Sequence, residues 1–324
     1  MRILEYMVSI IIISTLGMLY NRYKRKYGSD EELKGNDLVN KYLLNDEMLF
    51  GKPNIWIHIN HEVNSRNWKS FQSRNSQELN KPYINICIES IIKHNDNDFN
   101  IFLINDNSFE KLLPGFNVNM NKIPENLKKY VRKMGFCKIL QKYGGMNLPK
   151  SFLATRCLRD FYYEGINGNK MFCVENINNT PTNFEQKFLA DDIILGCNKF
   201  CNKIDKYCEY INELVTSGMI GENEVKGYNS RWLEEESKKF NINKIDGVFI
   251  GLKDKSKNYI RSEELLNVSK ISFVNEKYGV YINEEIMERR NKLNWFNRLS
   301  KKQLLESDTQ IGNEMLLSLG EGVI

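Results

Sequence analysis

The chain has 324 residues, of which 41% are hydrophobic and 27% are charged, and its 46 Lys and Arg slightly outnumber its 41 Asp and Glu. This composition excludes an intrinsically disordered chain and a polytopic membrane protein, and it supplies enough apolar side chains for a sizeable core. A net charge of +5 is too small to indicate a nucleic-acid-binding protein, so we expect no nucleic-acid partner.

Residues 3–20 form an almost wholly apolar run at the start of the chain. This run is close to the roughly 17 residues that a helix needs to span a bilayer. Four basic side chains follow within residues 22–26, where a cleaved signal peptide would carry small residues. We therefore predict a transmembrane anchor with a basic flank over residues 1–26; a buried first helix of the domain is the alternative. The basic flank predicts a single-pass protein whose C-terminal domain is cytoplasmic.

The cysteines are scattered along the chain without a metal-binding spacing. There are seven, none of them in a CxxC pair, and the chain has only three His. Cys197 and Cys201 stand at the i, i+4 spacing of a helix, but no second pair of ligands accompanies them. We expect reduced, structural thiols in a reducing compartment, and no structural zinc site.

A polar spacer over residues 27–52 precedes a predicted domain over residues 53–324. The alternation of apolar residues predicts a strand at 55–60, the apolar face of 82–93 predicts a helix, and the apolar run at 100–104 predicts a second strand. Strand, helix and strand with short links form a βαβ unit. Such a unit favours a parallel sheet that binds ligands at the carboxyl ends of its strands.

The clearest helix covers residues 124–143, because its apolar residues recur on one face and Gly144-Gly145 end it. A short extended piece follows at 146–150. Further elements are predicted as strands at 171–174, 193–196 and 247–251, and as helices at 204–215, at 232–240 and after residue 284. The simplest interpretation is a single α/β domain.

The helix and the segment after it, Tyr143-Gly144-Gly145-Met146-Asn147-Leu148-Pro149-Lys150-Ser151, resemble the signature of glycosyltransferases that bind sugar nucleotides through a DXD motif. The strand around His58 and the segment Asp192–Cys197 resemble two other parts of that family. The resemblance covers roughly residues 53–215. It implies a GT-A-like fold, in which a Rossmann-type mixed sheet flanked by helices is joined to an acceptor-binding half.

The resemblance and the βαβ argument together give a set of candidate site residues. The candidates for binding a nucleotide-sugar donor and a glycan or protein acceptor are His58, Asp106, Arg132, Gly144, Gly145, Asn147, Lys150 and Ser151. Asp192 falls near the family's acceptor position and is the candidate general base. Each assignment has a structural alternative: a helix terminus for the glycine pair, a core position for His58, an Asx-turn for Asp106, an exposed strand edge for Asp192 and a solvated helix face for the basic residues.

The chain departs from the family at the metal site. The two carboxylates of the DXD motif align with Pro149 and Ser151, so the oxygen ligands for Mn²⁺ or Mg²⁺ are missing. On the helix, Lys133 and Phe136 replace the family's Asp and Arg. We therefore predict a degenerate DXD site, in which Lys and Arg side chains contact the diphosphate directly; binding of Mn²⁺ or Mg²⁺ without the DXD carboxylates is the alternative. The same departures resemble a subgroup found in giant DNA viruses.

The sequence therefore predicts a membrane-anchored, glycosyltransferase-like protein, in a host-cell or virion membrane if its source is viral. It would transfer a hexosyl group from a nucleotide sugar in glycan or polysaccharide synthesis. The alternative is a catalytically inactive GT-A-like scaffold or binding protein at a membrane.

Overall fold

The computed structural model describes residues 51–59, 81–116, 118–178, 187–216 and 222–320, all within one compact unit, Leu44–Ile324. The predicted anchor over residues 1–26 and nearly all of the predicted spacer lie outside the described residues. In the part of the chain that is described, no helix combines the length and the apolarity needed to cross a membrane.

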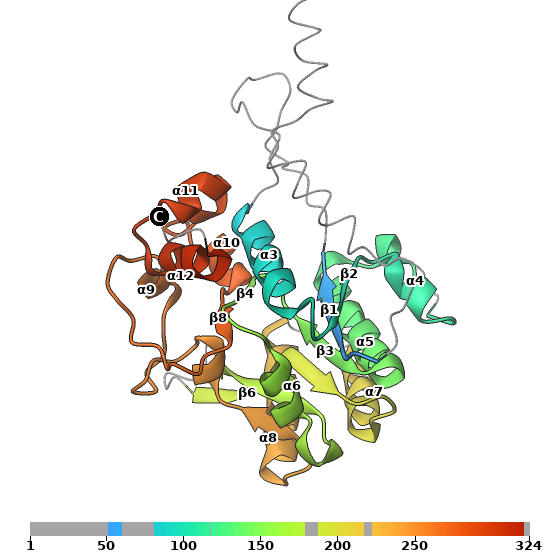
Figure 1. Cartoon of the computed structure of the whole chain (residues 1–324). Helices are drawn as coiled ribbons and strands as arrows, with labels where there is room; N and C mark the ends of the chain where they lie inside the picture. The colour runs from blue at the N-terminus through green and yellow to red at the C-terminus, as the bar shows by residue number, and fades with distance from the viewer. Residues whose placement is uncertain (1–50, 60–80, 117, 179–186, 217–221, 321–324) are drawn as a thin grey trace, which may run out of the picture. The chain divides into compact units, whose positions relative to one another are not determined.

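The described residues form a six-stranded mixed sheet in the order β2-β1-β3-β6-β5-β7 (Figure 1). Its strands are β1 (Asn54–His58), β2 (Asn100–Ile104), β3 (Gly145–Leu148), β5 (Phe172–Asn178), β6 (Lys187–Cys197) and β7 (Asn243–Ile245). Within this sheet β6 runs antiparallel to its neighbours β3 and β5, whereas the other paired strands are parallel. The mixed sheet flanked by helices confirms the predicted α/β class.

The predicted βαβ unit is confirmed. Helix α3 (Tyr83–Asn95) connects β1 to β2, and the two strands pair in parallel with Asn54 opposite Asn100. The predicted long helix is α5 (Glu125–Tyr143), and the predicted helix at 204–215 is α7 (Asn202–Thr216). Helices α5 and α7 pack against each other, and α8 (Glu222–Lys238) packs on β6.

Two apolar clusters hold the described residues together. The first joins the sheet to α5, α7 and α8; in it Trp56 stacks on Phe102 with ring centroids 4.7 Å apart, and its indole N–H donates to the carbonyl of Gly144 at 3.0 Å. The second cluster joins α3 to the C-terminal helices and includes Tyr83 and Phe296. In Figure 1 these C-terminal helices gather beside α3.

A short antiparallel ribbon of β4 (Phe152–Ala154) and β8 (Gly279–Tyr281) lies in the second cluster. The helices around it are α9 (Ser262–Leu265), α10 (Glu284–Arg289), α11 (Lys301–Leu305) and α12 (Gln310–Leu319). Two further short helices are α4 (Ser108–Leu112) and α6 (Arg159–Gly165). The ribbon was not expected from the sequence, because each of its strands is only three residues long and its partner is remote in the chain.

The predicted strand at 247–251 is wrong. Residues Gly247–Ile250 form a 3-10 helix, which begins where the carboxylate of Asp246 accepts a hydrogen bond from the amide of Val248 at 3.0 Å. Gly251 ends it in the left-handed conformation, with φ of 69°. An aspartate cap and a terminal glycine are helix signals, and they outweigh the apolar run between them. The strand of this region is β7, which comes just before.

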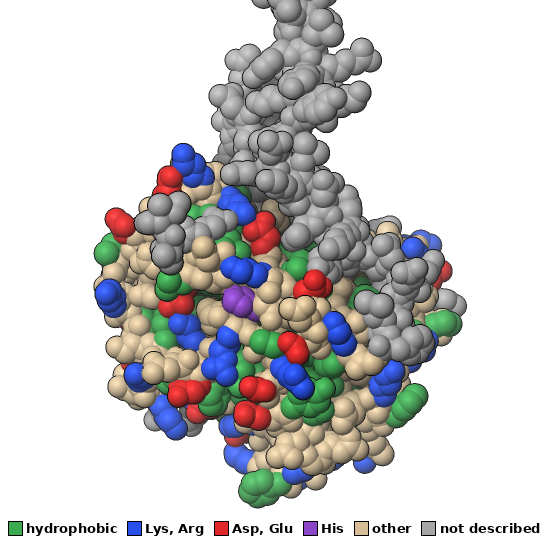
Figure 2. Space-filling model, in the orientation of Figure 1, with side chains coloured by type: hydrophobic (Ala, Val, Ile, Leu, Met, Phe, Trp, Pro, Cys, Tyr) green, Lys and Arg blue, Asp and Glu red, His purple; other side chains and the backbone are tan. Residues whose placement is uncertain are grey.

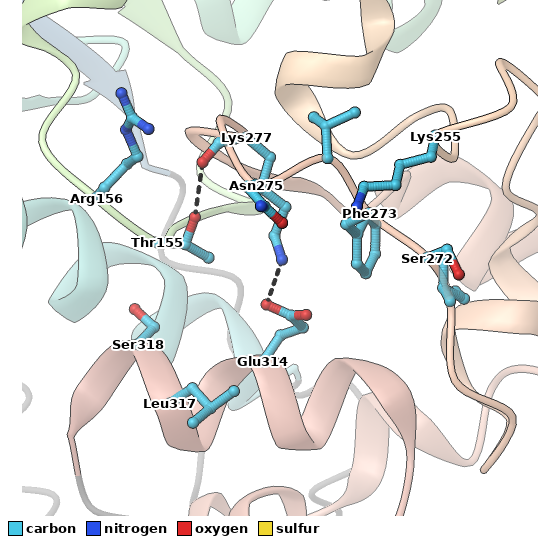
Figure 3. A pocket seen from close by; sticks show the side chains of 12 residues that line it. Thr155, Arg156, Lys255, Ser272, Phe273, Asn275, Lys277, Glu314, Leu317 and Ser318 are labelled. Atoms are coloured by element: carbon cyan, nitrogen blue, oxygen red, sulfur yellow. Dashed lines mark hydrogen bonds and ion pairs between the residues drawn. The ribbon is translucent and has the colours of Figure 1, made fainter.

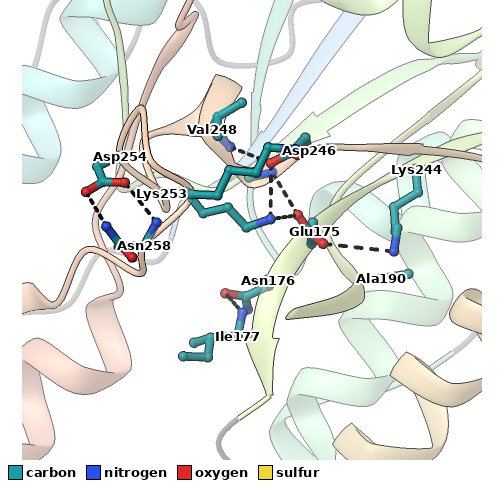
Figure 4. Close-up of polar contacts among 12 residues, drawn as sticks. Glu175, Asn176, Ile177, Ala190, Lys244, Asp246, Val248, Lys253, Asp254 and Asn258 are labelled. Atoms are coloured by element: carbon teal, nitrogen blue, oxygen red, sulfur yellow. Dashed lines mark hydrogen bonds and ion pairs between the residues drawn. The ribbon is translucent and has the colours of Figure 1, made fainter. Parts of the chain in front are cut away.

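A network of charged side chains ties β5, β7 and the loop after them (Figure 4). The ammonium of Lys253 lies between the carboxylates of Glu175 and Asp246, and the distance to Asp246 is 3.2 Å. Lys244 of β7 pairs with Glu234 of α8 at 3.1 Å. Burial alone would raise the pKa of Asp246, but hydrogen bonds from the Val248 amide and Lys253 hold it below its usual range. These ion pairs hold the edge strand β7 in place.

Charge of both signs covers the described surface. Figure 2 shows basic and acidic side chains interspersed on the visible face, without an area of one sign alone. This distribution agrees with the sequence, in which five of the 46 basic residues precede residue 27, as does one of the 41 acidic residues. The domain is thus near neutral.

All seven cysteines lie within the described residues and are free thiols. Five are buried, whereas Cys201 is half-buried and directly precedes α7. A hydrogen bond from the Cys197 thiol and others from the amides of Ile204 and Lys203 outweigh burial and lower the pKa of Cys201 to about 6. Cys201 therefore differs from the inert structural thiols that the sequence predicts.

We expect Cys201 to be the most reactive thiol of the described domain. At pH 7 a thiol whose pKa is about 6 is mostly thiolate, and the thiolate is the nucleophile. Titration of the folded chain with Ellman's reagent should show one fast thiol, and Cys201→Ser should remove that phase. Cys157→Ser is the control, because burial raises the pKa of this other half-buried thiol. A fast phase that survives Cys201→Ser would contradict the assignment.

Candidate functional site

The carboxyl ends of three parallel strands bring predicted site residues to one edge of the sheet. His58 is the last residue of β1, Asp106 follows β2 closely, and Lys150 follows β3. Because β1 pairs in parallel with both β2 and β3, these ends lie together. This is the edge at which α/β sheets bind ligands.

Asp106 is held between His58 and Arg132. Its carboxylate accepts from Nε and Nη2 of Arg132 at 2.8 Å each, which is a bidentate pair, and it lies 2.8 Å from Nε2 of His58. Burial would raise the pKa of Asp106, but the hydrogen bonds from Arg132 and His58 outweigh it and hold the pKa well below its usual range. The Asx-turn at this point is formed by Asn105, whose side-chain oxygen accepts from the amides of Asn107 and Ser108.

His58 is neutral in this arrangement. Burial lowers its pKa by more than the contact with Asp106 raises it, and Arg132 and Lys150 lower it further. An ionised carboxylate only accepts hydrogen bonds, so Nε2 of His58 carries the proton and Nδ1 is left as an acceptor. His58 thus offers a ligand a neutral imidazole beside two cations.

Lys150 belongs to a second set of charges at the same edge. Its ammonium lies 3.0 Å from Oε1 of Glu284, and the ammonium of Lys81 lies 2.7 Å from the same oxygen. Lys81 also pairs with Glu288. Burial would raise the pKa of Glu284, but Lys150 and Lys81 outweigh it and keep that pKa below its usual value. Glu284 is therefore an ionised bridge between the two lysines.

The sequence did not identify Lys81 and Glu284. They come from the start of α3 and the start of α10, and no short motif links them to Lys150. The single local signal was Asn283, whose side chain accepts from the amide of Ile286 and so caps α10. That cap predicts where the helix starts in the sequence. It does not predict that the first side chain of the helix, Glu284, lies beside Lys150 in the fold.

Asp192 is buried in contacts that hold the helices to the sheet. Its two oxygens lie 2.5 and 2.6 Å from the ammonium of Lys133, and it accepts from the hydroxyl of Tyr207 at 2.7 Å and from the amide of Asn229 at 3.4 Å. These partners come from α5, α7 and α8. Its role as a general base stays a prediction, and the geometry favours a structural role, because both oxygens already accept hydrogen bonds.

Asn147 and Ser151 serve the packing of the sheet and the ribbon. The amide of Asn147 donates to the carbonyl of Ile193 at 3.1 Å and accepts from the amide of Leu195 at 2.8 Å, which ties β3 to β6. Ser151 is buried, and its carbonyl accepts from the amide of Ile282 at 3.1 Å. Their predicted contact with substrate remains untested.

Gly144 and Gly145 lie at the opposite edge of the sheet from His58 and Lys150. Gly145 begins β3, whereas Lys150 follows its end, so the strand itself separates them. The glycines line a pocket of about 320 Å³ together with Tyr143, Tyr162 and Lys199. The structure therefore divides the predicted site between two edges.

Close packing explains the glycine pair without a ligand. Their φ values are 68° and 95°, a region that favours glycine. A Cβ on Gly145 would stand 2.1 Å from the carbonyl oxygen of Asn54, and one on Gly144 would stand 2.9 Å from the amide of Lys199. The pair lets α5 turn directly into β3 beside β1.

The described residues do not offer a typical metal site. Within them no three His, Cys, Asp or Glu side chains are grouped so as to hold a metal ion. The carboxylates at the edge, those of Asp106 and Glu284, instead face cations.

No protein-family model and no curated protein sequence matches this chain. Among solved structures, the chain is similar to the galactosyltransferase LgtC in complex with donor and acceptor sugar analogues. The match has 13% sequence identity and a TM-score of 0.34, and it covers 61% of this chain and 75% of that chain.

We expect Asp106→Asn to cost about 2–3 kcal/mol at pH 7, because it removes the ionised carboxylate that accepts two hydrogen bonds from Arg132. The pKa of Asp106 is depressed far below its usual range in the folded state, so the full stabilisation is present above its unfolded pKa of about 3.9 and is lost only as the pH falls through the much lower folded-state pKa. Urea unfolding of the wild type and the variant should therefore differ most at pH 7, and the difference should be smaller, but still present, at pH 3. An equal difference at both pH values would contradict this pairing.

Proposed function

We propose that this chain is a membrane-anchored, glycosyltransferase-like protein that binds a nucleotide sugar at the carboxyl edge of β1, β2 and β3. Lys150 and Arg132 take the place of a metal ion against the diphosphate. The observation that supports the proposal is their convergence around His58. The carboxylate of Asp106 lies 2.8 Å from both His58 and Arg132, and Lys150 follows β3, which pairs in parallel with the strand that ends at His58.

The polar groups of this edge suit such a ligand. A diphosphate carries charge that cations neutralise, and Arg binds phosphate oxygens in bidentate geometry. Lys150 is 18% exposed and Arg132 is 20% exposed, so neither ammonium nor guanidinium is sealed from solvent. The neutral imidazole of His58 offers an acceptor for a sugar hydroxyl. The donor sugar is a hexose in this proposal, and the acceptor is a glycan or a protein.

The anchor, the cytoplasmic orientation, the viral subgroup and the host or virion membrane rest on the sequence. If residues 3–20 span the bilayer, the full-length chain should remain in the membrane pellet after carbonate extraction at high pH. A chain that lacks residues 1–26 should move to the soluble fraction. Release of the full-length chain by carbonate would contradict the anchor.

A second candidate function is a catalytically inactive, GT-A-like scaffold or binding protein at a membrane. One observation favours it: the cations of this edge already have internal partners. Arg132 pairs with Asp106, Lys133 with Asp192, and Lys150 with Glu284. A diphosphate must compete with these carboxylates, which lowers its affinity.

Ligand-induced stabilisation tests the proposal directly. Full-length chain in detergent is screened by thermal unfolding against nucleotide sugars, in EDTA and in Mn²⁺. A ligand at 100 times its Kd adds about 2.7 kcal/mol of stability. We expect a stabilising nucleotide sugar that acts in EDTA, and we expect that sugar to be turned over with release of the nucleoside diphosphate. Binding without turnover would favour the scaffold, and the absence of any stabilising nucleotide sugar would overturn the proposal.

A further inference from the structure

A second pocket lies away from the proposed donor site, at the other end of the β4–β8 ribbon. At one end of this ribbon Phe152 pairs with Tyr281, next to Lys150 and Glu284; at the other end Ala154 pairs with Gly279. The pocket opens beyond that second end. It has a volume of about 520 Å³ and lies between the link after β4, the loop 271–277 and α12 (Figure 3).

This pocket carries positive charge that the described residues leave unbalanced. Lys277 is neutralised by Glu314 of α12 at 2.8 Å. Arg156 and Lys255 also line the pocket, and within the described part of the chain neither of them pairs with a carboxylate. The proposed donor site differs in this respect, because its cations are paired. An anion therefore meets less internal competition in this pocket.

The two cations are held on opposite sides of the opening. The guanidinium of Arg156 lies over the ring of Tyr278, 4.3 Å from its centroid. The backbone amide of Lys255 donates to the carbonyl of Ser272 at 2.8 Å, which ties this lysine to the loop. Figure 3 shows the ammonium of Lys255 directed towards Phe273 and Asn275, with Arg156 on the far rim.

The rest of the lining is suited to a hydroxyl-rich ring. Hydroxyl and amide groups come from Thr155, Ser272, Asn275 and Ser318. The hydroxyl of Thr155 donates to the carbonyl of Lys277, which leaves its lone pairs as acceptors for a ligand. The hydroxyl of Ser318 is instead buried, where it donates to the carbonyl of Ala154 and lies 3.2 Å from Nε2 of His94. Apolar contact comes from Phe273 and from Leu317, whose side chain is 70% exposed.

From these features we infer that the pocket binds an anionic saccharide unit. Lys255 and Arg156 attract its negative charge from opposite sides of the opening, the exposed hydroxyls and amides bind its ring hydroxyls, and Leu317 with Phe273 covers an apolar face of the ring. The site is separate from the proposed nucleotide-sugar site. Saccharide binding in this pocket can therefore be tested independently of the proposed donor binding.

The test compares a tetrasaccharide of galacturonic acid with the same tetrasaccharide after reduction of its carboxyl groups. Binding to the full-length chain is measured by saturation-transfer NMR in a concentration series. We expect the acidic tetrasaccharide to bind at least tenfold more tightly, and we expect salt to weaken it. Glucose 1-phosphate forms a third arm, which distinguishes a phosphate from a carboxylate as the acidic group.

Variants locate the binding. We expect Lys255→Met and Arg156→Met each to weaken the acidic ligand about tenfold, as the loss of a charged hydrogen bond does. Lys270→Met is the matched control, because Lys270 is an exposed lysine at the start of the same loop and does not line the pocket. Lys255 is exposed, so its variant should fold even if Arg156→Met does not. Equal binding of the acidic and reduced tetrasaccharides, or the same affinity in Lys255→Met and Lys270→Met, would overturn the inference.

Discussion

Lys133→Met should destabilise the protein by about 2–3 kcal/mol, because it removes the cation from an ion pair in which the carboxylate is buried and the lysine is 31% exposed. The carboxylate of Asp192 is 7% exposed and lies against Lys133, so the substitution leaves an ionised group buried without its cation. The contacts of Asp192 reach α5, α7 and α8, and all three helices therefore lose support for their position on the sheet. The measurement is the urea midpoint at pH 7.

Two comparison variants make this result specific. Lys138→Met changes an exposed lysine of the same helix and should alter stability by less than about 0.5 kcal/mol. The double variant Lys133→Met/Asp192→Leu removes both charges and should recover only part of the loss, because the buried hydroxyl of Tyr207 then lacks its acceptor. If Lys133→Met is as stable as Lys138→Met, Asp192 is not buried against α5, and its assignment as a general base becomes the better interpretation.

Gly145→Ala should cost about 2–4 kcal/mol, because two effects add. The added Cβ would stand 2.1 Å from the carbonyl oxygen of Asn54, which belongs to the neighbouring strand β1. Overpacking of this kind costs about 1–3 kcal/mol, and a positive φ costs a non-glycine residue about 1 kcal/mol more. The pair β1–β3 would have to separate at its first residues. Chemical unfolding of the variant measures the loss.

Gly168→Ala separates the two effects. Its φ of 71° is also positive, but the nearest atom to an added Cβ is 3.6 Å away, at the flexible end of Lys170. This variant should therefore lose only about 1 kcal/mol. If both variants lose the same stability, the close approach to β1 does not explain the glycine pair. A ligand contact at the amino edge of the sheet would then be the better explanation.

Local signals in the sequence predicted most of the sheet and its principal helices. The strand at 100–104 and the helix that Gly144 ends were readable because an apolar run or an apolar face continues over several residues and ends at turn residues. The ribbon of β4 and β8 was not readable, since strands of three residues carry no period and depend on a partner remote in the chain. Near residue 247 the Asp246 cap outweighed the apolar pattern.

The candidate site was predicted in part. The rule for the ends of parallel strands brought His58, Asp106 and Lys150 to one edge, and the structure places them there. The extended piece predicted at 146–150 already put Gly145 at the amino end of its strand, but the resemblance assigned the glycine to the same site as Lys150. The ion pairs that Lys150 and Asp192 form could not be predicted, because their partners are set by the packing of helices far apart in sequence.

The ion pairs of these cations bear on both candidate functions, the transferase and the inactive scaffold. A carboxyl edge whose cations replace a metal is compatible with donor binding, while internal neutralisation of the same cations is compatible with an inactive relative. Lys150 is the informative residue, because Lys150→Met leaves Glu284 paired with Lys81 and so should preserve the fold. Lys199→Met is its counterpart at the amino edge, in the pocket of the glycine pair.

The most direct test is calorimetric titration of the full-length chain with the nucleotide sugar that stabilises it most, in EDTA and in Mn²⁺. Our account predicts binding in EDTA that Mn²⁺ does not strengthen. It also predicts that Lys150→Met weakens the affinity about tenfold, as loss of one charged contact does, and that Lys199→Met leaves it unchanged. Absence of binding, a requirement for Mn²⁺, or a loss in Lys199→Met with none in Lys150→Met would contradict it.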